Sequence, residues 1–418
     1  EELFSPLLTA EQARAVRDLA GTPAYVYSES VLRQRAAEAL AFPAPFGLCV
    51  RFAMKACPNA SILRLFDSLG IHFDASSGFE AERLLRAGIQ PQCISLSSQE
   101  LPSDLAGLVR KGLRFDACSP RQLEEYGKLF PGSELSLRIN PGLGSGHSRR
   151  TNVGGPAASF GIWHGRLPEV LEICERYSLR IGVMHTHIGS GADPDVWARV
   201  ARLNLEIVRK LPHVHTLNMG GGFKVARVPG EKQTDLQATG GIVARSLEEF
   251  AALTGRRLKL EIEPGTFLAA QAGAVVSTVQ DLASTGAEGF NFLKLDTGMT
   301  ELLRPSLYGA QHGIRVYPAQ ETGRVLPYLV AGHCCESGDI LTPAPGDPEG
   351  LLARELPEAA IGDLCVIEGA GAYCAAMPAK NYNSFPEAPE LLLRADGSLS
   401  LIRRRQTIEQ MLGNEVID

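Results

Sequence analysis

A lysine, a histidine and a glutamate each stand at the end of a strand-like apolar run in this sequence. Lys55 follows GLCVRFAM, His187 lies in HTHIGSG, and Glu263 directly precedes a Pro-Gly pair. A lysine amine with a lowered pKa can act as a covalent nucleophile. A carboxylate can keep a proton on a nitrogen that faces it. The three residue types predict a site for amine-based covalent chemistry.

A run of three glycines follows another strand-like segment. Gly220, Gly221 and Gly222 leave backbone N–H groups free to face an anion, with no Cβ in the way. A flexible turn would look the same in isolation. The run follows the seventh of eight strand-like segments, however, and barrel enzymes bind phosphate at the loops after strands 7 and 8. A lysine, an imidazole, a carboxylate and a phosphate cradle together suit a pyridoxal phosphate enzyme.

Eight strand-like runs alternate with segments of helical periodicity in the first part of the chain. This alternation predicts an α/β fold with a (β/α)8 TIM-type barrel, whose active site is built at the C-terminal ends of the strands. Each run ends on a small polar or glycine cluster, at Lys55, Asp74, Ser97, Asp116, Arg138, His187, Gly220 to Gly222 and Glu263.

The alternation of strand-like and helical segments stops after Pro264, where strand-like runs follow one another with little helix between them. The DGS turn at 396–398 predicts a hairpin. We therefore expect a second, mainly antiparallel β domain. The expected domains are a barrel over 25–268 and a β domain formed by 269–418 with a contribution from 1–24.

Two readings of these residues stay open at this stage. Lys55 at the end of a buried strand would carry a desolvation cost that lowers its pKa, but it could also extend to the surface. Glu261 and Glu263 are two positions apart on one strand. Period-two alternation therefore points both to one side and cannot separate their roles.

The H-x-H pair offers a different chemistry. His185 and His187 point the same way on a strand, and with Asp74 and Asp116 they could bind a metal in a barrel hydrolase. That interpretation leaves Lys55 and the glycines unused, so we expect no metal.

The amino-acid composition indicates which kinds of binding partner to expect. The chain has 418 residues and a net charge of −6, and its basic residues are scattered, which argues against nucleic acid. No apolar run of about 18 residues predicts a membrane span. Nine cysteines without C-x-x-C spacing predict free thiols in a reducing compartment, and we expect a cytoplasmic location and a small-molecule substrate.

Many motifs occur in a fixed order from about Tyr25 to the C-terminus. They are RFAMKACPN, FDASSGFE, LRINPG with GHSRRTNVGG, HTHIGSG, NMGGG, EPG, RPSLYGAQH, CESGD, GAGAYCA, NYNSFPEAPE and RRRQTIEQML. In these motifs the chain resembles the fold type III pyridoxal phosphate-dependent decarboxylases, most closely the bacterial diaminopimelate decarboxylases. The resemblance implies decarboxylation of meso-2,6-diaminopimelate to L-lysine and CO2, the last step of lysine biosynthesis.

The resemblance also implies roles for single residues. Lys55 would hold the cofactor covalently, and His187 would stack on its ring with His185 in support. Glu263 would face the pyridine nitrogen, and Cys335 would return a proton to the substrate carbon. The implied cofactor-binding set is Lys55, Asp74, His187, Ser190, Gly220, Gly221, Gly222, Glu263, Gly265 and Tyr373. The implied substrate-binding set is Arg304, Tyr308, Glu336 and Tyr373. Because the CES and GAY segments of this family reach the other subunit's site, a homodimer is implied as well.

One position departs from the family pattern. The family reads E-P-G-R where this chain has Thr266 after Gly265. A threonine hydroxyl cannot replace the charge-assisted contact of an arginine. Either another arginine substitutes, for which Arg149 and Arg150 are candidates, or the substrate differs. A relative acting on ornithine, carboxynorspermidine or a siderophore or antibiotic intermediate, a racemase, and a catalytically silent binding homologue therefore stay as alternatives.

Overall fold

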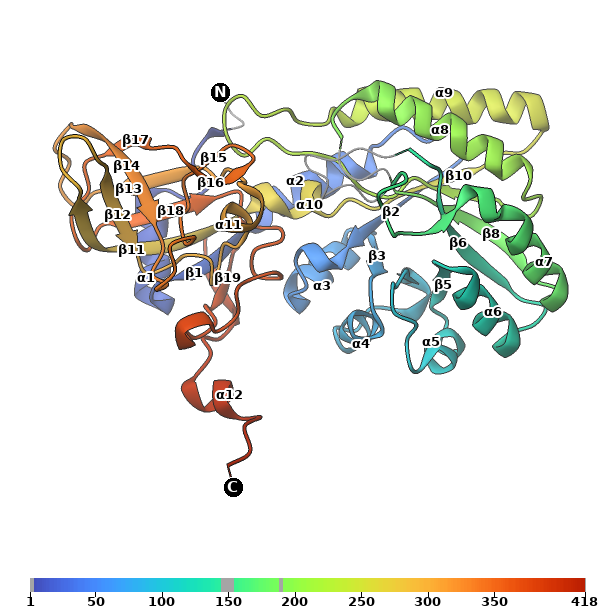
Figure 1. The fold of residues 1–418 in the computed structure, drawn as a ribbon, viewed down its shortest axis with the longest axis horizontal. Helices are drawn as coiled ribbons and strands as arrows, with labels where there is room; N and C mark the ends of the chain where they lie inside the picture. Colours follow the sequence, from blue (N-terminus) through green and yellow to red (C-terminus); the bar gives the residue numbers. More distant parts are fainter. Residues whose placement is uncertain (1–3, 144–153, 188–190, 418) are drawn as a thin grey trace. The chain divides into compact units, whose positions relative to one another are not determined.

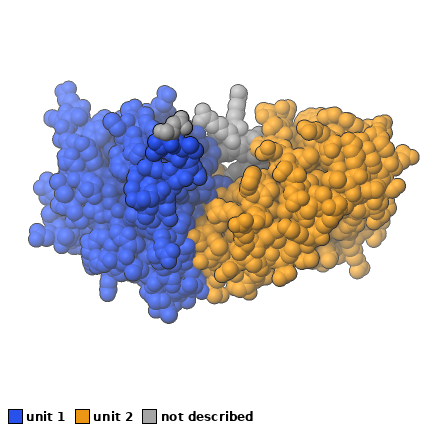
Figure 2. Space-filling view, turned by 90° about the horizontal axis from the view of Figure 1, so that it is seen from below, with its two compact units in different colours: residues 1–32, 225–231, 269–418 blue, residues 33–224, 232–268 orange. Residues whose placement is uncertain are grey.

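The computed structural model describes residues 4–143, 154–187 and 191–417. The chain divides into two compact units, which Figure 2 shows in different colours. We call Arg33–Lys224 with Lys232–Leu268 the barrel unit. We call Glu1–Leu32, Val225–Glu231 and Ala269–Asp418 the β unit.

The barrel unit contains a closed parallel sheet. Its strands follow the order β5-β4-β3-β2-β10-β9-β8-β6, and β6 pairs again with β5 to close the ring. The predicted TIM-type barrel is thereby confirmed. The strands are β2 (Leu48–Ala53), β3 (His72–Ala75), β4 (Ile94–Leu96), β5 (Arg114–Ala117), β6 (Glu134–Asn140), β8 (Arg180–His185), β9 (Thr216–Asn218) and β10 (Lys259–Ile262), with the short β7 (Ile162–Trp163) beside β6.

Burial on both faces explains the sequence of these strands. In β8, every residue from Ile181 to His185 is buried, and β3 is buried from Phe73 onward. A parallel strand covered by helices on one side and by the barrel interior on the other loses its polar alternation. The runs therefore read as continuously apolar up to the polar residues at their C-terminal ends.

Helices cover the outside of this ring, as Figure 1 shows for α3 to α7. Of the helices in the described residues, none is long and apolar enough to cross a membrane. The helices that follow strands or precede the barrel are α2 (Glu29–Leu40), α3 (Ala60–Ser68), α4 (Gly78–Arg86), α5 (Leu105–Lys111), α6 (Pro120–Leu129), α7 (Leu167–Tyr177), α8 (Pro194–Arg209) and α9 (Leu236–Thr254), and α10 (Thr266–Ala269) follows the last strand.

Local signals set where these helices begin and end. The Ser119 hydroxyl accepts from the N–H of Gln122 at the start of α6, and Pro120 occupies the first helical position. After α3 and α4 the chain reverses at Gly70 (φ +84°) and Gly88 (φ +90°). Glycine takes these left-handed conformations without a Cβ clash. These stops keep the helices short enough to return the chain to the next strand.

The β unit is built on a nine-stranded sheet. Its main order is β17-β14-β12-β11-β1-β19-β20, and β18 pairs with both β11 and β13. Two pairings are parallel, β1 with β19 and β12 with β14, and the rest are antiparallel, so the expected mainly antiparallel unit is confirmed. The strands are β1 (Ala24–Ser28), β11 (Gly273–Ser284), β12 (Asn291–Leu295), β13 (Ile314–Tyr317), β14 (Val325–Ala331), β17 (Arg354–Pro357), β18 (Leu364–Glu368), β19 (Glu390–Leu393) and β20 (Leu399–Arg403).

The N-terminal segment completes the core of the β unit. Helix α1 (Ala10–Ala20) contributes Ala13 and Val16 to an apolar cluster that includes Val276, Val366 and Leu391 from three strands. The predicted hairpin at 396–398 joins β19 to β20, with Gly397 at φ +86°. The unit also contains α11 (Arg304–Tyr308), α12 (Ile408–Leu412) and the small ribbon of β15 (Pro343–Ala344) and β16 (Asp347–Leu351).

Candidate active site

The C-terminal ends of the barrel strands bring together most of the residues predicted there. Backbone hydrogen bonds join neighbouring strands at this end. The N–H of Glu263 donates to the carbonyl of Gly220 (2.8 Å), and the N–H of Thr186 donates to the carbonyl of Asn218 (2.9 Å). We use the name barrel mouth for Lys55, Asp74, Asp116, Arg138, His185, His187, Gly220 to Gly222 and Glu263.

Lys55 lies in a single 3-10 turn, Met54–Ala56, that follows β2. Its side chain is exposed, because the residue stands two positions past the last residue of the strand. Of the two alternatives left open by the sequence, the structure shows the exposed side chain. Its positive charge nevertheless acts on its neighbours: it opposes the rise that burial causes in the pKa of Asp74, and it adds to the lowering that burial causes in the pKa of His187.

Asp74 is the buried carboxyl of β3. Ser97 donates its hydroxyl to Asp74 Oδ1 at 2.8 Å. Burial and the negative charge of Glu263 raise the pKa of Asp74, and His185 and Lys55 oppose that shift. The barrel mouth thus holds a carboxyl whose proton is retained more readily than in water.

His185 stands between two carboxylates. Its Nδ1 is hydrogen-bonded to Oδ2 of Asp116. Its Nε2 lies 2.7 Å from Oε1 of Glu263 without the angle that a hydrogen bond requires, so we treat that contact as an ion pair. Burial disfavours the charged ring, but Glu263 and Asp116 outweigh it and raise the pKa of His185 to about 10. The ring is therefore an imidazolium at neutral pH.

The structure separates the two glutamates that the period-two pattern could not. Glu261 accepts from Arg51 and Arg114, with the shortest contact 2.6 Å from Nη2 of Arg114. Burial alone would raise the pKa of Glu261, yet these guanidinium groups lower it to about 2. Glu263 instead faces His185, and the amide of Asn218 donates to both glutamates at 3.1 Å.

Glu263 is ionised despite its burial. Desolvation would raise its pKa, but His185 is the strongest of several positive groups that hold the pKa well below the ordinary value. Glu261 is thus a structural carboxylate of the barrel interior, and Glu263 is the carboxylate of the barrel mouth.

His187 differs from His185 in its charge. Burial, followed by Arg138 and Lys55, holds the pKa of His187 well below its usual range, so the ring is neutral. Arg138, in β6, also lies over the ring of Phe160 at 5.1 Å. The strand-end pattern marked Arg138, but no role was predicted for it or for Asn218.

The glycine run forms a tight turn. Gly220 has φ +71°, and a Cβ there would lie 2.4 Å from the carbonyl oxygen of Thr186. A Cβ on Gly221 would lie 2.5 Å from the carbonyl oxygen of Glu263. Side chains are therefore excluded from this turn by the neighbouring strand ends. Gly265 is buried just beyond β10.

Three predicted residues lie outside the described residues. They are Ser190, expected at the phosphate, and Arg149 and Arg150, the candidates for replacing the family's arginine.

The remaining predicted residues belong to the β unit. Arg304 and Tyr308 occupy the one-turn helix α11 and are partly buried. Nη1 of Arg304 lies 3.2 Å from Nε2 of His312, whose Nδ1 lies 2.9 Å from the carbonyl oxygen of Glu368. Because a carbonyl can only accept, Nδ1 carries the proton, and Nε2 accepts from Arg304. Burial and Arg304 keep the pKa of His312 low, which maintains that tautomer.

Cys335 and Glu336 are exposed on a loop of the β unit. The N–H of Cys335 donates to Oδ1 of Asn383 at 2.7 Å, and Asn383 has a left-handed φ of 53°. The neighbouring Asp339 accepts from Met299 and Cys334. Two motifs far apart in sequence, CESGD and NYNSF, therefore fix one loop together.

Tyr373 also has a left-handed backbone, with φ 56°. The GAGAY segment around it contacts Arg227, whose Nε donates to the carbonyl of Gly369 at 3.0 Å. No role was predicted for Arg227 from the sequence. Its only sequence signal is an arginine five positions after the glycine run.

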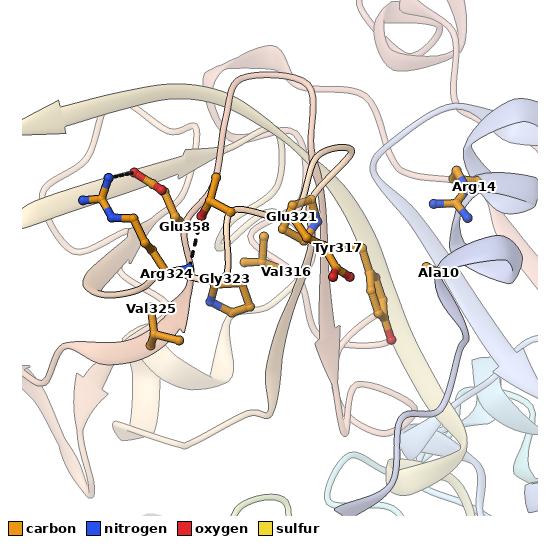
Figure 3. Close-up of a pocket in the computed structure, with 12 residues that line it drawn as sticks. Ala10, Arg14, Val316, Tyr317, Glu321, Gly323, Arg324, Val325 and Glu358 are labelled. Atoms are coloured by element: carbon orange, nitrogen blue, oxygen red, sulfur yellow. Dashed lines mark hydrogen bonds and ion pairs between the residues drawn. The ribbon is translucent and has the colours of Figure 1, made fainter.

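A separate groove of the β unit contains none of the predicted residues. Figure 3 shows it between α1 and the loop after β13, with Arg14, Tyr317 and Glu321 in its lining. Its Arg324 is already paired with Glu358 at 3.1 Å.

The metal interpretation of the H-x-H pair does not fit this geometry. Both ring nitrogens of His185 face carboxylates, so neither offers a free lone pair, and the ring is positively charged. Within the part of the chain that the structure describes, no three His, Cys, Asp or Glu side chains are grouped so as to hold a metal ion.

The fold and the barrel mouth agree with a known class of enzymes. The family model described as pyridoxal-dependent decarboxylase, pyridoxal binding domain, matches residues 29–270. The chain is therefore a member of the pyridoxal-dependent decarboxylases, with the barrel and the accompanying β unit that their fold type requires.

Relatives of known identity narrow this class. The chain is 36% identical to the diaminopimelate decarboxylase of Escherichia coli K12, over 98% of this chain and 97% of the relative. A crystal structure of a diaminopimelate decarboxylase superposes with a TM-score of 0.89 at 36% identity and covers 98% of both chains. The enzyme from Helicobacter pylori complexed with L-lysine gives a TM-score of 0.84 at 26% identity, over 96% of this chain and 98% of that one. This chain belongs to the diaminopimelate decarboxylase family.

Proposed function

We propose that this chain removes CO2 from meso-2,6-diaminopimelate to yield L-lysine, with pyridoxal phosphate as its cofactor. The observation that carries the proposal is the barrel mouth, where an exposed amine, an ionised carboxylate and a glycine turn converge on strand ends. The near full-length similarity to diaminopimelate decarboxylases supports the choice of substrate.

The charge of the barrel mouth fits the cofactor's ring. Glu263 is ionised and faces the His185 imidazolium, which also contacts Asp116. A protonated pyridine nitrogen would be a second cationic partner for the Glu263 carboxylate. Glu263 retains lone pairs for such a partner, because each carboxylate oxygen accepts more than one bond.

The glycine turn fits a phosphate. The N–H groups of Gly221 and Gly222 donate to none of the residues that the structure describes, while Gly220 donates to Oδ1 of Asn218 at 2.8 Å. Glycines at these positions carry no Cβ that could come between the N–H groups and an oxyanion. Ser190 is proposed as a further phosphate ligand from the family resemblance alone.

When bound, pyridoxal phosphate supplies an electron-accepting ring that takes up negative charge as CO2 leaves. Lys55 would hold the cofactor covalently, with Asp74 and Gly265 beside it. Glu263 would keep the proton on the ring nitrogen. The neutral ring of His187 would present a flat face without adding charge.

The substrate contacts are proposed from the β unit. Cys335 would deliver a proton from Sγ to the substrate carbon, and Glu336 would pair with the distal ammonium group. Arg304, Tyr308 and Tyr373 would contact the substrate's carboxylate. The exposure of Cys335 in a single chain supports a homodimer in which this loop serves the partner's site. The domain limits 25–268 and 269–418 with 1–24, and the cytoplasmic location, likewise stay proposals.

A second candidate follows from Thr266 alone. The missing arginine favours a related decarboxylase acting on another diamino acid, provided that no other residue of the chain supplies the charge.

Release of CO2 from a panel of amino acids tests the assignment. The purified enzyme, supplied with pyridoxal phosphate, would receive meso-diaminopimelate, L-ornithine, L-lysine and carboxynorspermidine at equal concentration. We expect kcat/KM for meso-diaminopimelate to exceed the others by at least two orders of magnitude, since a site built for a substrate's polar group rejects analogues that lack it. A higher kcat/KM for any other compound would establish the second candidate instead.

A further inference from the structure

Arg227 is held in the β unit against the backbone of the GAGAY segment. Its Nε donates to the carbonyl of Gly369 at 3.0 Å. A Cβ on Gly369, which has φ +66°, would lie 2.8 Å from Cγ of Arg227, so a glycine is needed where the arginine packs. The position of the guanidinium is therefore built into the fold and is not that of a loose surface side chain.

The outer end of this guanidinium is unsatisfied. Nη2 of Arg227 is buried and has no hydrogen-bond partner among the described residues. A buried charged donor without an acceptor is costly, and native proteins rarely retain one without a reason. The exposed Glu231 accepts from the backbone N–H of Arg227 at 2.7 Å and forms no ion pair with its guanidinium.

A second guanidinium is held at the neighbouring residue of the same segment. Arg304 donates to Nε2 of His312, whose Nδ1 donates to the carbonyl of Glu368, and Arg227 donates to the carbonyl of the next residue, Gly369. Burial and then Arg304 lower the pKa of Arg227, and neither arginine has a carboxylate within ion-pair distance in the described part of the chain. Arg304 is oriented by neutral His312. Arginine stays protonated under these conditions, so the two positive charges repel each other unless an anion joins them. Tyr373 and Cys374, in the GAGAY segment, complete this arginine cluster.

We propose that Arg227 and Arg304 together bind the substrate carboxylate that is retained in the product, and that Arg227 supplies the charge absent at Thr266. This inference rests on the proposed function, because it takes diaminopimelate as the substrate. Two guanidinium forks can engage both oxygens of one carboxylate, which a threonine hydroxyl cannot do. With Arg227 supplying this charge, the chain can bind diaminopimelate without an arginine at the position after Gly265.

Product binding by the holoenzyme tests the proposal without relying on turnover. L-Lysine retains the carboxylate, and cadaverine is the same molecule without it. Calorimetric titration of wild type and Arg227→Gln with both ligands should show L-lysine affinity falling about 10- to 100-fold, as for loss of a charged hydrogen bond. Cadaverine affinity should stay within about twofold. Arg227→Lys should recover part of the loss, because it keeps the charge but not the fork.

Arg405→Gln is the matched control. Arg405 is also a partly buried guanidinium of the β unit that donates to backbone carbonyls, those of Ala20 and Pro23. Its replacement should leave the L-lysine to cadaverine ratio unchanged. Unaltered L-lysine binding in Arg227→Gln, equal losses for both ligands, or loss of bound pyridoxal phosphate measured by absorbance would each overturn the proposal; the last would assign the site to the cofactor's phosphate. Absence of CO2 release from meso-diaminopimelate by wild type would instead refute the proposed function.

Discussion

In the barrel mouth, the imidazolium of His185 stands between Asp116 and Glu263, whereas in the β unit Arg227 and Arg304 have no carboxylate within ion-pair distance among the described residues. Both regions bury charge. They differ in where the compensating charge comes from.

This difference indicates two kinds of partner. Charges that are paired within the fold have their desolvation cost offset before any ligand arrives, so the barrel mouth is organised for a group that stays bound. Unpaired cations in the arginine cluster are stabilised only when an anion enters. Such a site suits a substrate and product that come and go with each turnover.

The largest effect is expected from removing the Lys55 amine in the barrel mouth. Lys55→Ala should lower CO2 release from meso-diaminopimelate by at least on the order of 10³-fold, as removal of a covalent catalytic group does. Lys210→Ala, at the exposed end of α8, should behave as wild type. Turnover by Lys55→Ala near the wild-type rate would show that the barrel mouth is not the site of chemistry.

Glu261 in β10 and Glu263 directly after it allow a test of whether the two carboxylates have different roles. Glu263→Gln should reduce kcat by about 10²-fold, because it removes a preorganised charge from the cofactor's position. Its matched counterpart, Glu261→Gln, should chiefly reduce the free energy of unfolding, by about 3 kcal/mol, because it leaves Arg51 and Arg114 buried without their carboxylate. Denaturant unfolding and steady-state kinetics on both variants would separate the effects. If both lose rate and stability alike, the two carboxylates share one role.

The pH dependence of stability tests whether the charges of the barrel mouth are paired as described. The folded pKa of His185 is raised to about 10, against an ordinary value of about 6.5. Its stabilising contribution is therefore fully present below pH ~6.5 and is lost as the pH rises towards ~10. The difference in unfolding free energy between wild type and His185→Gln should shrink across that range. A difference that stays constant with pH would mean that the ring is not an imidazolium.

The smallest expected effect concerns the loop of Cys335 in the β unit. Asn383→Ala removes the acceptor for the Cys335 N–H and places alanine at a left-handed backbone position. We expect kcat to fall about fivefold, in line with the loss of one hydrogen bond of ~1 kcal/mol. Asn383→Asp, which keeps an acceptor and tolerates that backbone, should retain more of the activity. Equal rates for the alanine and aspartate variants would argue that the loop is positioned without this bond.

Much of the fold was predictable because the signals that set it are local. Each of the eight barrel strands was marked by an apolar run with a polar end, and Ser119 with Pro120 marked the start of α6. The positions of Lys55, Asp74, His187 and Glu263 at strand ends followed from these runs. The choice between a buried and an exposed Lys55 did not, because it depends on the turn after the strand.

The sequence by itself determined that this chain forms a closed parallel barrel followed by a β unit, and it placed the reactive side chains at the strand ends, because period and residue type act over a few neighbouring residues. The tertiary structure alone decided which charges meet. Asp116 and His185 are 69 residues apart, and Arg114 and Glu261 are 147 apart. Partners of that kind set whether Glu263 or Glu261 is available for chemistry, and they hold Arg227 and the His312 that orients Arg304 at the adjacent carbonyls of Gly369 and Glu368. Electrostatic pairing depends on distance in space, which no local pattern encodes.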